Sequence, residues 1–225
     1  MDSKEFHSYQ EKTIQRFKDI LGSHPQGFCD EQGLPSYTNP NPLMRWLTWK
    51  RVEVLLSEIN SQNLEKGRAL DFGCGYGVFL PYLNQSVKHT IAFDLNILEL
   101  KKMGMKLGWN RISFLDDFSK LASMKKSFDL VLASEVLEHV ENLENTIKIF
   151  SDLLTDEGVL LVSGPTENIL YQIGRKLAGY SGEYHVRNIY HIKEVLARYF
   201  DIKVVGIIIP VFTFYEVYLC RKLRN

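Results

Sequence analysis

Cysteine is scarce in this 225-residue sequence, and neither sign of charge is in excess. The three cysteines, Cys29, Cys74 and Cys220, have no spacing typical of a metal site or a disulfide framework. Such usage favours a reducing compartment, so we expect a cytoplasmic protein. Lys and Arg together number 27, as do Asp and Glu. No overall field would therefore draw the protein to nucleic acid or to an anionic membrane.

Long apolar runs are also missing. Residues 1–5 are polar, where an export signal would show a basic stretch and then an apolar run, so we expect no export. The longest apolar stretch, 204–220, is interrupted by Pro210 and Glu216 and is shorter than the ~20 residues of a membrane-spanning helix. With 45% hydrophobic and 24% charged residues, the composition is typical of a soluble globular domain.

Short apolar runs alternate with helical patterns from residue 68 onward, which is typical of β-α-β units in a parallel sheet. Two further apolar runs close the chain, and their tight connection through Pro210 predicts an antiparallel hairpin. We therefore predict an α/β fold with a Rossmann-like, doubly wound, mostly parallel seven-stranded sheet, a C-terminal antiparallel hairpin and extra N-terminal helices. The expected strands are 69–72, 90–93, 112–115, 130–133, 159–162, 202–209 and 214–219.

Residues 1–62 precede these units, and we predict that they form a helical extension or cap. Asp2 and Glu5 are placed as a capping pair for a first helix, and Asn41 is placed as the cap of a second. The proline- and glycine-rich segment between the helices, 22–42, is predicted to be a loop.

The main domain is predicted to span 63–225. It contains a segment unlike the rest, 166–190, in which a short amphipathic pattern precedes a loop rich in glycine and tyrosine. We predict that this segment is a lid-like insertion, with a plain surface insertion as the alternative.

A glycine-rich turn, Asp71-Phe72-Gly73-Cys74-Gly75-Tyr76-Gly77, follows the first expected strand. Glycines there let a ligand lie against the backbone and permit the turn angles. Asp94 stands about 20 residues later, where a carboxylate can accept the hydroxyls of a ribose or, alternatively, cap the next helix. A dinucleotide fingerprint would place its third glycine at position 78, which is Val78 here. The spacing therefore argues against an NAD(P)-dependent oxidoreductase, which stays as an alternative.

Several segments resemble, in order, the motifs of class I S-adenosylmethionine-dependent methyltransferases. Ala69-Leu70-Asp71-Phe72-Gly73-Cys74-Gly75-Tyr76-Gly77 resembles motif I. Ala92-Phe93-Asp94-Leu95 is similar to the acidic post-motif, 114–118 to the adenine loop, and 128–140 to motif II. The resemblance covers residues 68–165. It implies a methyltransferase that uses S-adenosylmethionine and releases S-adenosylhomocysteine, with a non-catalytic cofactor-binding partner subunit as a further alternative.

The resemblance also implies roles for residues at matching positions. Gly73 and Gly75 would contact the methionine part and Asp94 the ribose, while Ser134 would line the pocket. Asp117, or alternatively Asp116, would bind the adenine amino group, and a helix start is the other reading of this pair. The predicted cofactor-binding residues are Arg45, Asp71, Gly73, Cys74, Gly75, Gly77, Asp94, Leu95, Asp116, Asp117 and Ser134.

Arg45 enters that set through the segment Asn39-Pro40-Asn41-Pro42-Leu43-Met44-Arg45. This segment resembles the entry segment of ubiquinone-pathway O-methyltransferases, in which an arginine binds the cofactor carboxylate. Met44 places Arg45 one position late, so a solvent-facing arginine is the alternative.

Methyl transfer from a sulfonium needs mainly alignment and exclusion of water, and it needs a base only for a hydroxyl or a protonated amine. Glu135, Glu138 and His139 have the spacing i, i+3 and i+4, which predicts one helix face beside the cofactor. The alternative is that Glu135 caps the helix or lines the pocket, while Glu138 and His139 form a solvated first turn. We predict Glu135, His139 and His185 as catalytic residues.

A divalent metal at this string is a separate hypothesis. Glu135-x-x-Glu138-His139 resembles the metal site of small-RNA 2′-O-methyltransferases and of some ubiquinone-pathway O-methyltransferases, and His185 would add a ligand. One helical turn with acids and a histidine is also common on surfaces. We therefore predict no metal-binding residue.

The acceptor is predicted from an absence. Family members that methylate DNA bases carry Asn-Pro-Pro-aromatic after the fourth strand, where this chain has Ser134-Glu135-Val136-Leu137. Together with the zero net charge, this favours a small-molecule or lipid-linked, amphiphilic acceptor methylated at oxygen, with no nucleic-acid partner.

Overall fold

The computed structural model describes residues 1–23, 34–166, 189–208 and 214–223. The strands in these ranges are β1 (Arg68–Phe72), β2 (His89–Phe93), β3 (Ile112–Leu115), β4 (Phe128–Ser134), β5 (Leu154–Pro165), β6 (Phe200–Ile208) and β7 (Tyr215–Lys222). The α-helices are α1 (Ser3–Ser23), α2 (Leu34–Tyr37), α3 (Pro42–Ser61), α4 (Leu80–Ser86), α5 (Leu98–Lys106), α6 (Phe118–Ala122), α7 (Leu143–Leu153) and α9 (Ile189–Leu196). A 3-10 helix, η1 (Leu137–His139), follows β4.

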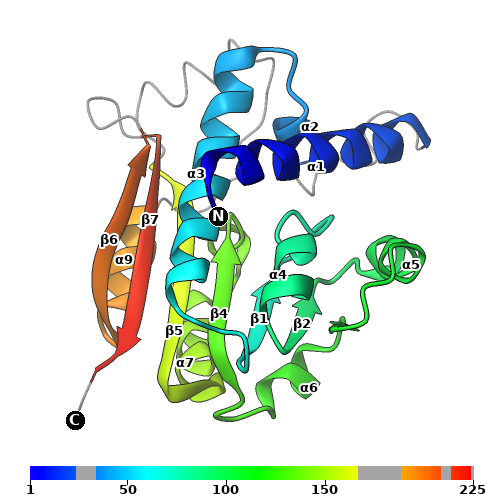
Figure 1. The fold of residues 1–225 in the computed structure, drawn as a ribbon. Helices are drawn as coiled ribbons and strands as arrows, with labels where there is room; N and C mark the ends of the chain where they lie inside the picture. The colour runs from blue at the N-terminus through cyan, green and yellow to red at the C-terminus, as the bar shows by residue number, and fades with distance from the viewer. Residues whose placement is uncertain (24–33, 167–188, 209–213, 224–225) are drawn as a thin grey trace.

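The seven strands form one sheet in the order β3-β2-β1-β4-β5-β7-β6. The first five are parallel, whereas β7 runs antiparallel to both β5 and β6 (Figure 1). This confirms the predicted fold class. The winding direction reverses between β1 and β4, and in open α/β sheets ligands bind beyond the carboxyl ends of the strands at such a point. The tip of the C-terminal hairpin, 209–213, lies outside the described residues.

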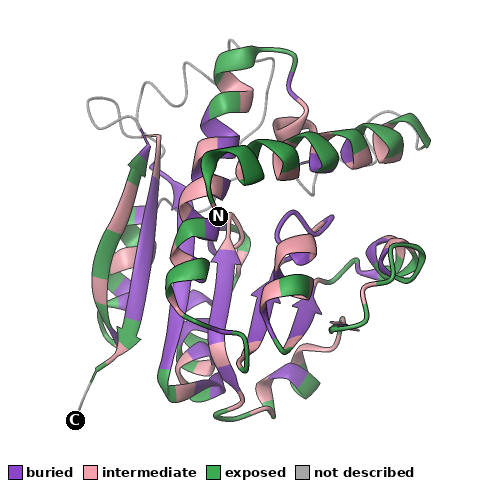
Figure 2. Ribbon diagram, viewed as in Figure 1, coloured by how far each residue is buried: buried purple, intermediate pink, exposed green. Residues whose placement is uncertain are grey.

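Helices cover both faces of the sheet, so the central strands carry apolar residues on both faces. In β4, Leu130 and Leu132 pack with α3 and α4, whereas Val131 and Ala133 pack with α7 and α9. All four side chains are fully buried, and the middle of the sheet is buried throughout (Figure 2). This core holds the carboxyl ends of β1 and β4 in fixed positions.

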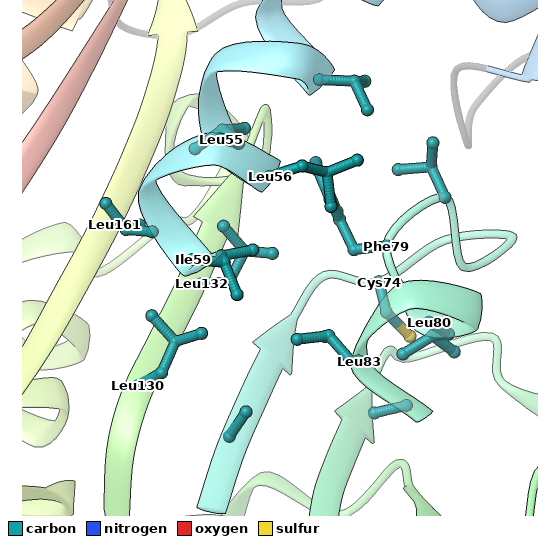
Figure 3. Close-up of a cluster of buried hydrophobic side chains, with 14 of the residues drawn as sticks. Leu55, Leu56, Ile59, Cys74, Phe79, Leu80, Leu83, Leu130, Leu132 and Leu161 are labelled. Atoms are coloured by element: carbon teal, nitrogen blue, oxygen red, sulfur yellow. The ribbon is translucent and has the colours of Figure 1, made fainter. Parts of the chain in front are cut away.

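Helix α3 belongs to one of these two layers. Leu55, Leu56 and Ile59 lie against the β4 residues Leu130 and Leu132 in a shared cluster of buried side chains (Figure 3). The helix therefore shares its core with the strands. The division of the chain at residue 62 stays a prediction.

The two predicted helix caps at the N-terminus are confirmed. The Asp2 and Glu5 backbone N–H groups each donate to the other residue's carboxylate, both at 2.9 Å. The Asn41 side chain accepts from the first turn of α3. The predicted loop 22–42 instead contains the short helix α2, because Leu34 is drawn into the core. None of the helices in the described ranges is long and apolar enough to cross a membrane.

Gly158 lies within β5 at a point of close packing. Helix α7 ends at Leu153 and β5 begins at once. A Cβ at Gly158 would lie 2.8 Å from the Phe128 carbonyl oxygen. Glycine is needed here because β5 passes very close to the start of β4.

Most of the predicted lid-like insertion, residues 167–188, lies outside the described residues, as does the short amphipathic segment expected within it. Thr166, which precedes it, is buried and donates its backbone N–H to the Phe214 carbonyl at 3.1 Å.

Candidate active site

The glycine-rich turn between β1 and α4 has the backbone that only glycine adopts readily. Gly73, Gly75 and Gly77 have φ values of 70°, 49° and 70°. The turn is also tightly packed, since a Cβ at Gly73 would lie 2.3 Å from Cγ2 of Val136. Motif I therefore rests directly against the segment that follows β4, which contains two of the predicted catalytic residues, Glu135 and His139.

Asp94 at the end of β2 stabilises this turn. One of its carboxylate oxygens accepts the Gly75 N–H at 2.8 Å, and the other accepts the Asn96 N–H at 3.0 Å. The carboxylate is half-buried, and the next side chain, Leu95, is 84% exposed. Asp94 thus contacts motif I and the following turn at once, which places a negative charge beside the glycines.

Asp71, the last polar residue of β1, is a buried carboxylate. Only 2% of it is exposed, and its Oδ2 accepts no hydrogen bond within the described ranges. Burial, with the nearby negative charge of Asp94, raises the pKa of Asp71 to about 8. An ionised carboxylate in such a place is costly unless a cation or donors reach it, so the site is suited to a positively charged ligand group.

Helix α1 lies across the carboxyl ends of the strands (Figure 1) and is bonded to the glycine-rich turn. The Tyr9 hydroxyl donates to the Val78 carbonyl, and Nη2 of Arg16 donates to the Gly77 carbonyl at 3.0 Å. Burial lowers the pKa of Arg16 to about 10, so the guanidinium is charged at neutral pH. Sequence reasoning missed both residues, although their spacing of seven already predicted one shared helix face.

The acidic pair after β3 divides its roles. Asp117 caps α6, because its Oδ1 accepts the backbone N–H groups of Ser119 and Lys120 at 2.9 and 3.2 Å and the Ser119 hydroxyl at 2.5 Å. The Ser119 hydroxyl, together with these N–H groups, holds the pKa of Asp117 below its ordinary value. Asp116 is exposed. The helix-start reading of the pair therefore applies to Asp117.

The segment after β4 does not form the expected α-helical turn. Glu135 has a φ of 55°, and the chain then makes only the 3-10 helix η1. Glu138 is fully buried while His139 is exposed, so the predicted single face of Glu135, Glu138 and His139 is wrong. The left-handed residue breaks the helical spacing on which that prediction relied. His185, the third predicted catalytic residue, lies outside the described residues.

Glu135 is instead paired with Arg51 of α3, which sequence reasoning missed. Nη1 of Arg51 lies 2.9 Å from Oε2 of Glu135, and Nη2 donates to the Tyr37 hydroxyl at 3.2 Å. The guanidinium also lies 5.0 Å from the centre of the Tyr215 ring. Arg51 is only 4% exposed. An arginine within a run of buried helix positions was the available signal.

Three other predicted residues have simpler surroundings. The Ser134 hydroxyl lies 2.9 Å from the Ser163 hydroxyl at the carboxyl ends of β4 and β5. Arg45 is half-buried and donates to the carbonyl of Asn39, just before α3, at 2.7 Å. Cys74 is buried, and burial raises the pKa of its thiol well above the ordinary value. A protonated thiol of this kind packs as a small apolar side chain.

Comparison with known proteins identifies the family. A family model described as a methyltransferase domain matches residues 45–201, more than half of the chain. The chain belongs to this methyltransferase family. The predictions of a class I S-adenosylmethionine-dependent methyltransferase and of an enzyme are thereby confirmed. The oxidoreductase alternative is not favoured.

Curated relatives of this methyltransferase carry oxygen-directed names. The ubiquinone biosynthesis O-methyltransferase of Pelagibacter ubique is 27% identical over 161 residues, which are 69% of this chain and 65% of that protein. The protein of the same name from Rickettsia canadensis is 26% identical over 117 residues, 50% of each chain. The matched part thus spans between about half and just under two thirds of these relatives.

A solved structure shows the same fold. The magnesium protoporphyrin IX methyltransferase of Synechocystis PCC 6803, crystallised with S-adenosylhomocysteine, superposes with a TM-score of 0.66 at 19% identity. The match covers 91% of this chain and all of that one. At this identity the likeness supports the architecture rather than any particular acceptor.

Proposed function

We propose that this methyltransferase transfers the methyl group of S-adenosylmethionine to an oxygen of a small-molecule or lipid-linked acceptor. The observation that carries the proposal is the buried Asp71 carboxylate beside a glycine-rich turn that a second carboxylate, Asp94, braces. This arrangement suits a ligand with a cationic amino-acid end and a ribose. The choice of oxygen is supported by the names of the two curated relatives.

The residues present fit the cofactor. In this proposal Asp71 binds the ammonium of the methionine part, whose charge would satisfy the buried Oδ2 atom. The backbone of Gly73, Cys74, Gly75 and Gly77 lies against the same part. Asp94 binds the ribose hydroxyls, a role for which its carboxylate already stands at the end of β2.

The adenine end is proposed to lie between Leu95 and the acidic pair. The exposed Leu95 side chain would cover one face of the ring, and the exposed Asp116 would accept from the adenine amino group. Asp117, assigned to the same role as the other member of the pair, is the weaker candidate because it caps α6. We also propose that Arg45 binds the cofactor carboxylate, a role in which it would exchange its bond to the Asn39 carbonyl.

The cofactor supplies the methyl group as part of a sulfonium, which leaves as a neutral thioether. The chain has to align the acceptor and keep water out, and helix α1 already covers the glycine-rich turn. Ser134, at the carboxyl end of β4, would line the pocket. For a hydroxyl acceptor we propose an imidazole base, His139 or His185, because the Glu135 carboxylate is engaged by Arg51.

Calorimetry with S-adenosylhomocysteine and with NAD tests this function. We expect the wild type to bind S-adenosylhomocysteine and not NAD, and Asp94→Ala to weaken binding roughly 10- to 100-fold, as expected for the loss of charge-assisted hydrogen bonds. Glu99→Ala is the control, since it removes a carboxylate paired with Lys102 on the adjacent helix α5.

Tight binding of NAD, or equal affinity of wild type and Asp94→Ala, would overturn the assignment. Label transfer from the cofactor to a catechol, but not to the matched aromatic amine, is expected of an oxygen-directed enzyme. The reverse preference would remove the oxygen acceptor and leave the methyltransferase.

A further inference from the structure

The string Glu135-x-x-Glu138-His139 resembles a divalent-metal site, but the folded chain places a guanidinium there. Arg51 comes from α3, more than eighty residues earlier in the sequence, and its Nη1 lies 2.9 Å from Oε2 of Glu135. The pair is sheltered, since the Arg51 and Glu135 side chains are 5% and 21% exposed. Glu135 is therefore already neutralised by a cation that belongs to the protein.

With Arg51 in place, the residues do not fit a bound metal. A metal needs several ligand atoms that converge on one point. Here the Glu135 carboxylate is turned to Arg51, Glu138 is fully buried, and the neighbouring His139 is exposed. Within the described ranges, no group of three His, Cys, Asp or Glu side chains could hold a metal ion.

The surroundings of Arg51 keep its guanidinium charged. Burial works against that charge, but Glu135, Tyr37, Tyr215 and Glu138 outweigh it and raise the pKa of Arg51 above its ordinary value. The Tyr37 hydroxyl accepts from Nη2, and the Tyr215 ring faces the cation. Two carboxylates of the metal-like string and two tyrosines from separate elements thus surround one positive charge.

We propose that Arg51 is a built-in cation that takes the place of a divalent metal at the Glu135-x-x-Glu138 string, so that methyl transfer needs no metal. In this role Arg51 is a positioning residue. It holds Glu135 in its left-handed conformation beside Val136, which contacts the glycine-rich turn at Gly73. The proposal rests on the proposed function for its activity measurement alone.

Metal-dependent stability provides the test. The melting temperatures of wild type, Arg51→Ala and Arg51→Lys are measured in chelator and with added Mn²⁺. We expect Mn²⁺ to raise the melting temperature of Arg51→Ala by several degrees, because Mn²⁺ can then take the place of the guanidinium beside Glu135 and Glu138. Wild type and Arg51→Lys, which keep an internal cation, should not respond. The double variant Arg51→Ala/Glu135→Gln is the control that removes the ligand as well.

This design does not require Arg51→Ala to be stable without metal, since rescue by Mn²⁺ is itself the expected result. No response of Arg51→Ala to Mn²⁺ would overturn the proposal, as would Mn²⁺ binding by the wild type. Wild-type methyl transfer in chelator should be undiminished, and its loss would also overturn the proposal. The shift in melting temperature that S-adenosylhomocysteine induces, recorded in the same series, reports cofactor binding separately. Failure of the proposed function can therefore be distinguished from failure of the proposal for Arg51.

Discussion

Two acidic residues stand at the carboxyl ends of neighbouring strands, and only one of them has a cation. Glu135 follows β4 and is paired with Arg51 at 2.9 Å. Asp71 ends the polar part of β1, is 2% exposed, and has one oxygen with no hydrogen bond from any described residue. Strands β1 and β4 are paired in parallel, so the two carboxylates lie at the same end of the sheet, beyond the carboxyl ends of its central strands.

The difference separates an internal contact from a ligand site. A buried ion pair with both partners in the protein stabilises its own geometry and has little to offer a ligand. A buried carboxylate without a partner destabilises the protein alone and is relieved when a cation arrives. We therefore propose Asp71 as a ligand-binding residue, whereas Glu135 and Arg51 form an ion pair within the protein.

The largest expected effect is the loss of stability when the Arg51–Glu135 ion pair is broken. Arg51→Met should lower the free energy of unfolding by about 3–5 kcal/mol, because the sheltered Glu135 carboxylate loses its paired guanidinium. Urea unfolding of the apoprotein measures it. Arg45→Met on the same helix is the matched control and should cost about 1 kcal/mol, since Arg45 is half-buried and bonded to one carbonyl. Equal losses in the two variants would show that the Arg51–Glu135 ion pair contributes no special stability.

At Asp71, the other carboxylate, substitution is expected to change stability in the opposite direction. Asp71→Asn should weaken S-adenosylhomocysteine binding roughly 10- to 100-fold by removing the charge that faces the ammonium. The same change should make the apoprotein more stable above pH 8, because the ionised, desolvated group is gone. Calorimetry and thermal unfolding at pH 9 measure the two effects. A variant that both binds weakly and is less stable would show that Asp71 already has a cation partner.

The pH dependence of the wild type follows from the same group. The folded pKa of Asp71, about 8, lies above the unfolded value near 3.8. Its contribution to stability is therefore complete below about pH 4 and is lost as the pH rises through 8. Cofactor affinity should change the other way and increase up to about pH 8, because the ammonium binds the ionised form. Both trends should be absent in Asp71→Asn.

The smallest effects concern Asp116 and Asp117 after β3. As with Glu135 and Asp71, one carboxylate is bonded within the protein and the other is proposed to bind the ligand. Asp117→Ala should lower stability by about 1 kcal/mol through loss of a helix cap and leave cofactor affinity nearly unchanged. Asp116→Ala should reduce affinity a few-fold with little effect on stability. Urea unfolding and calorimetry on both variants check this. If Asp117→Ala proves the weaker binder, the adenine role returns to Asp117.

The parts of the site that depend on local sequence could be predicted. The glycine-rich turn and the Asn41 cap are fixed by neighbours within a few residues of the chain, and Asp94 follows the turn at a set spacing, so the spacing carries the information. The fold class followed from the alternation of strands and helices in the same way.

The rest depended on contacts between distant segments. Arg51 reaches Glu135 only because α3 packs across β4, and nothing near either residue in the sequence indicates the partner. The shared face expected for Glu135, Glu138 and His139 failed at a single left-handed residue, Glu135. The close approach of β5 to Phe128 at Gly158 is likewise a tertiary contact that no local pattern indicates.

The position of β7 bears on how the chain is made. It follows all the other described strands in the sequence, yet it lies inside the sheet between β5 and β6. During synthesis β5 keeps an unpaired edge until residues 215–222 have left the ribosome, and such edges invite pairing with other chains. Because β6 and β7 are close in sequence, they can pair with each other first and then dock on β5 as a unit. The sheet is therefore completed only after both strands of this hairpin have been made.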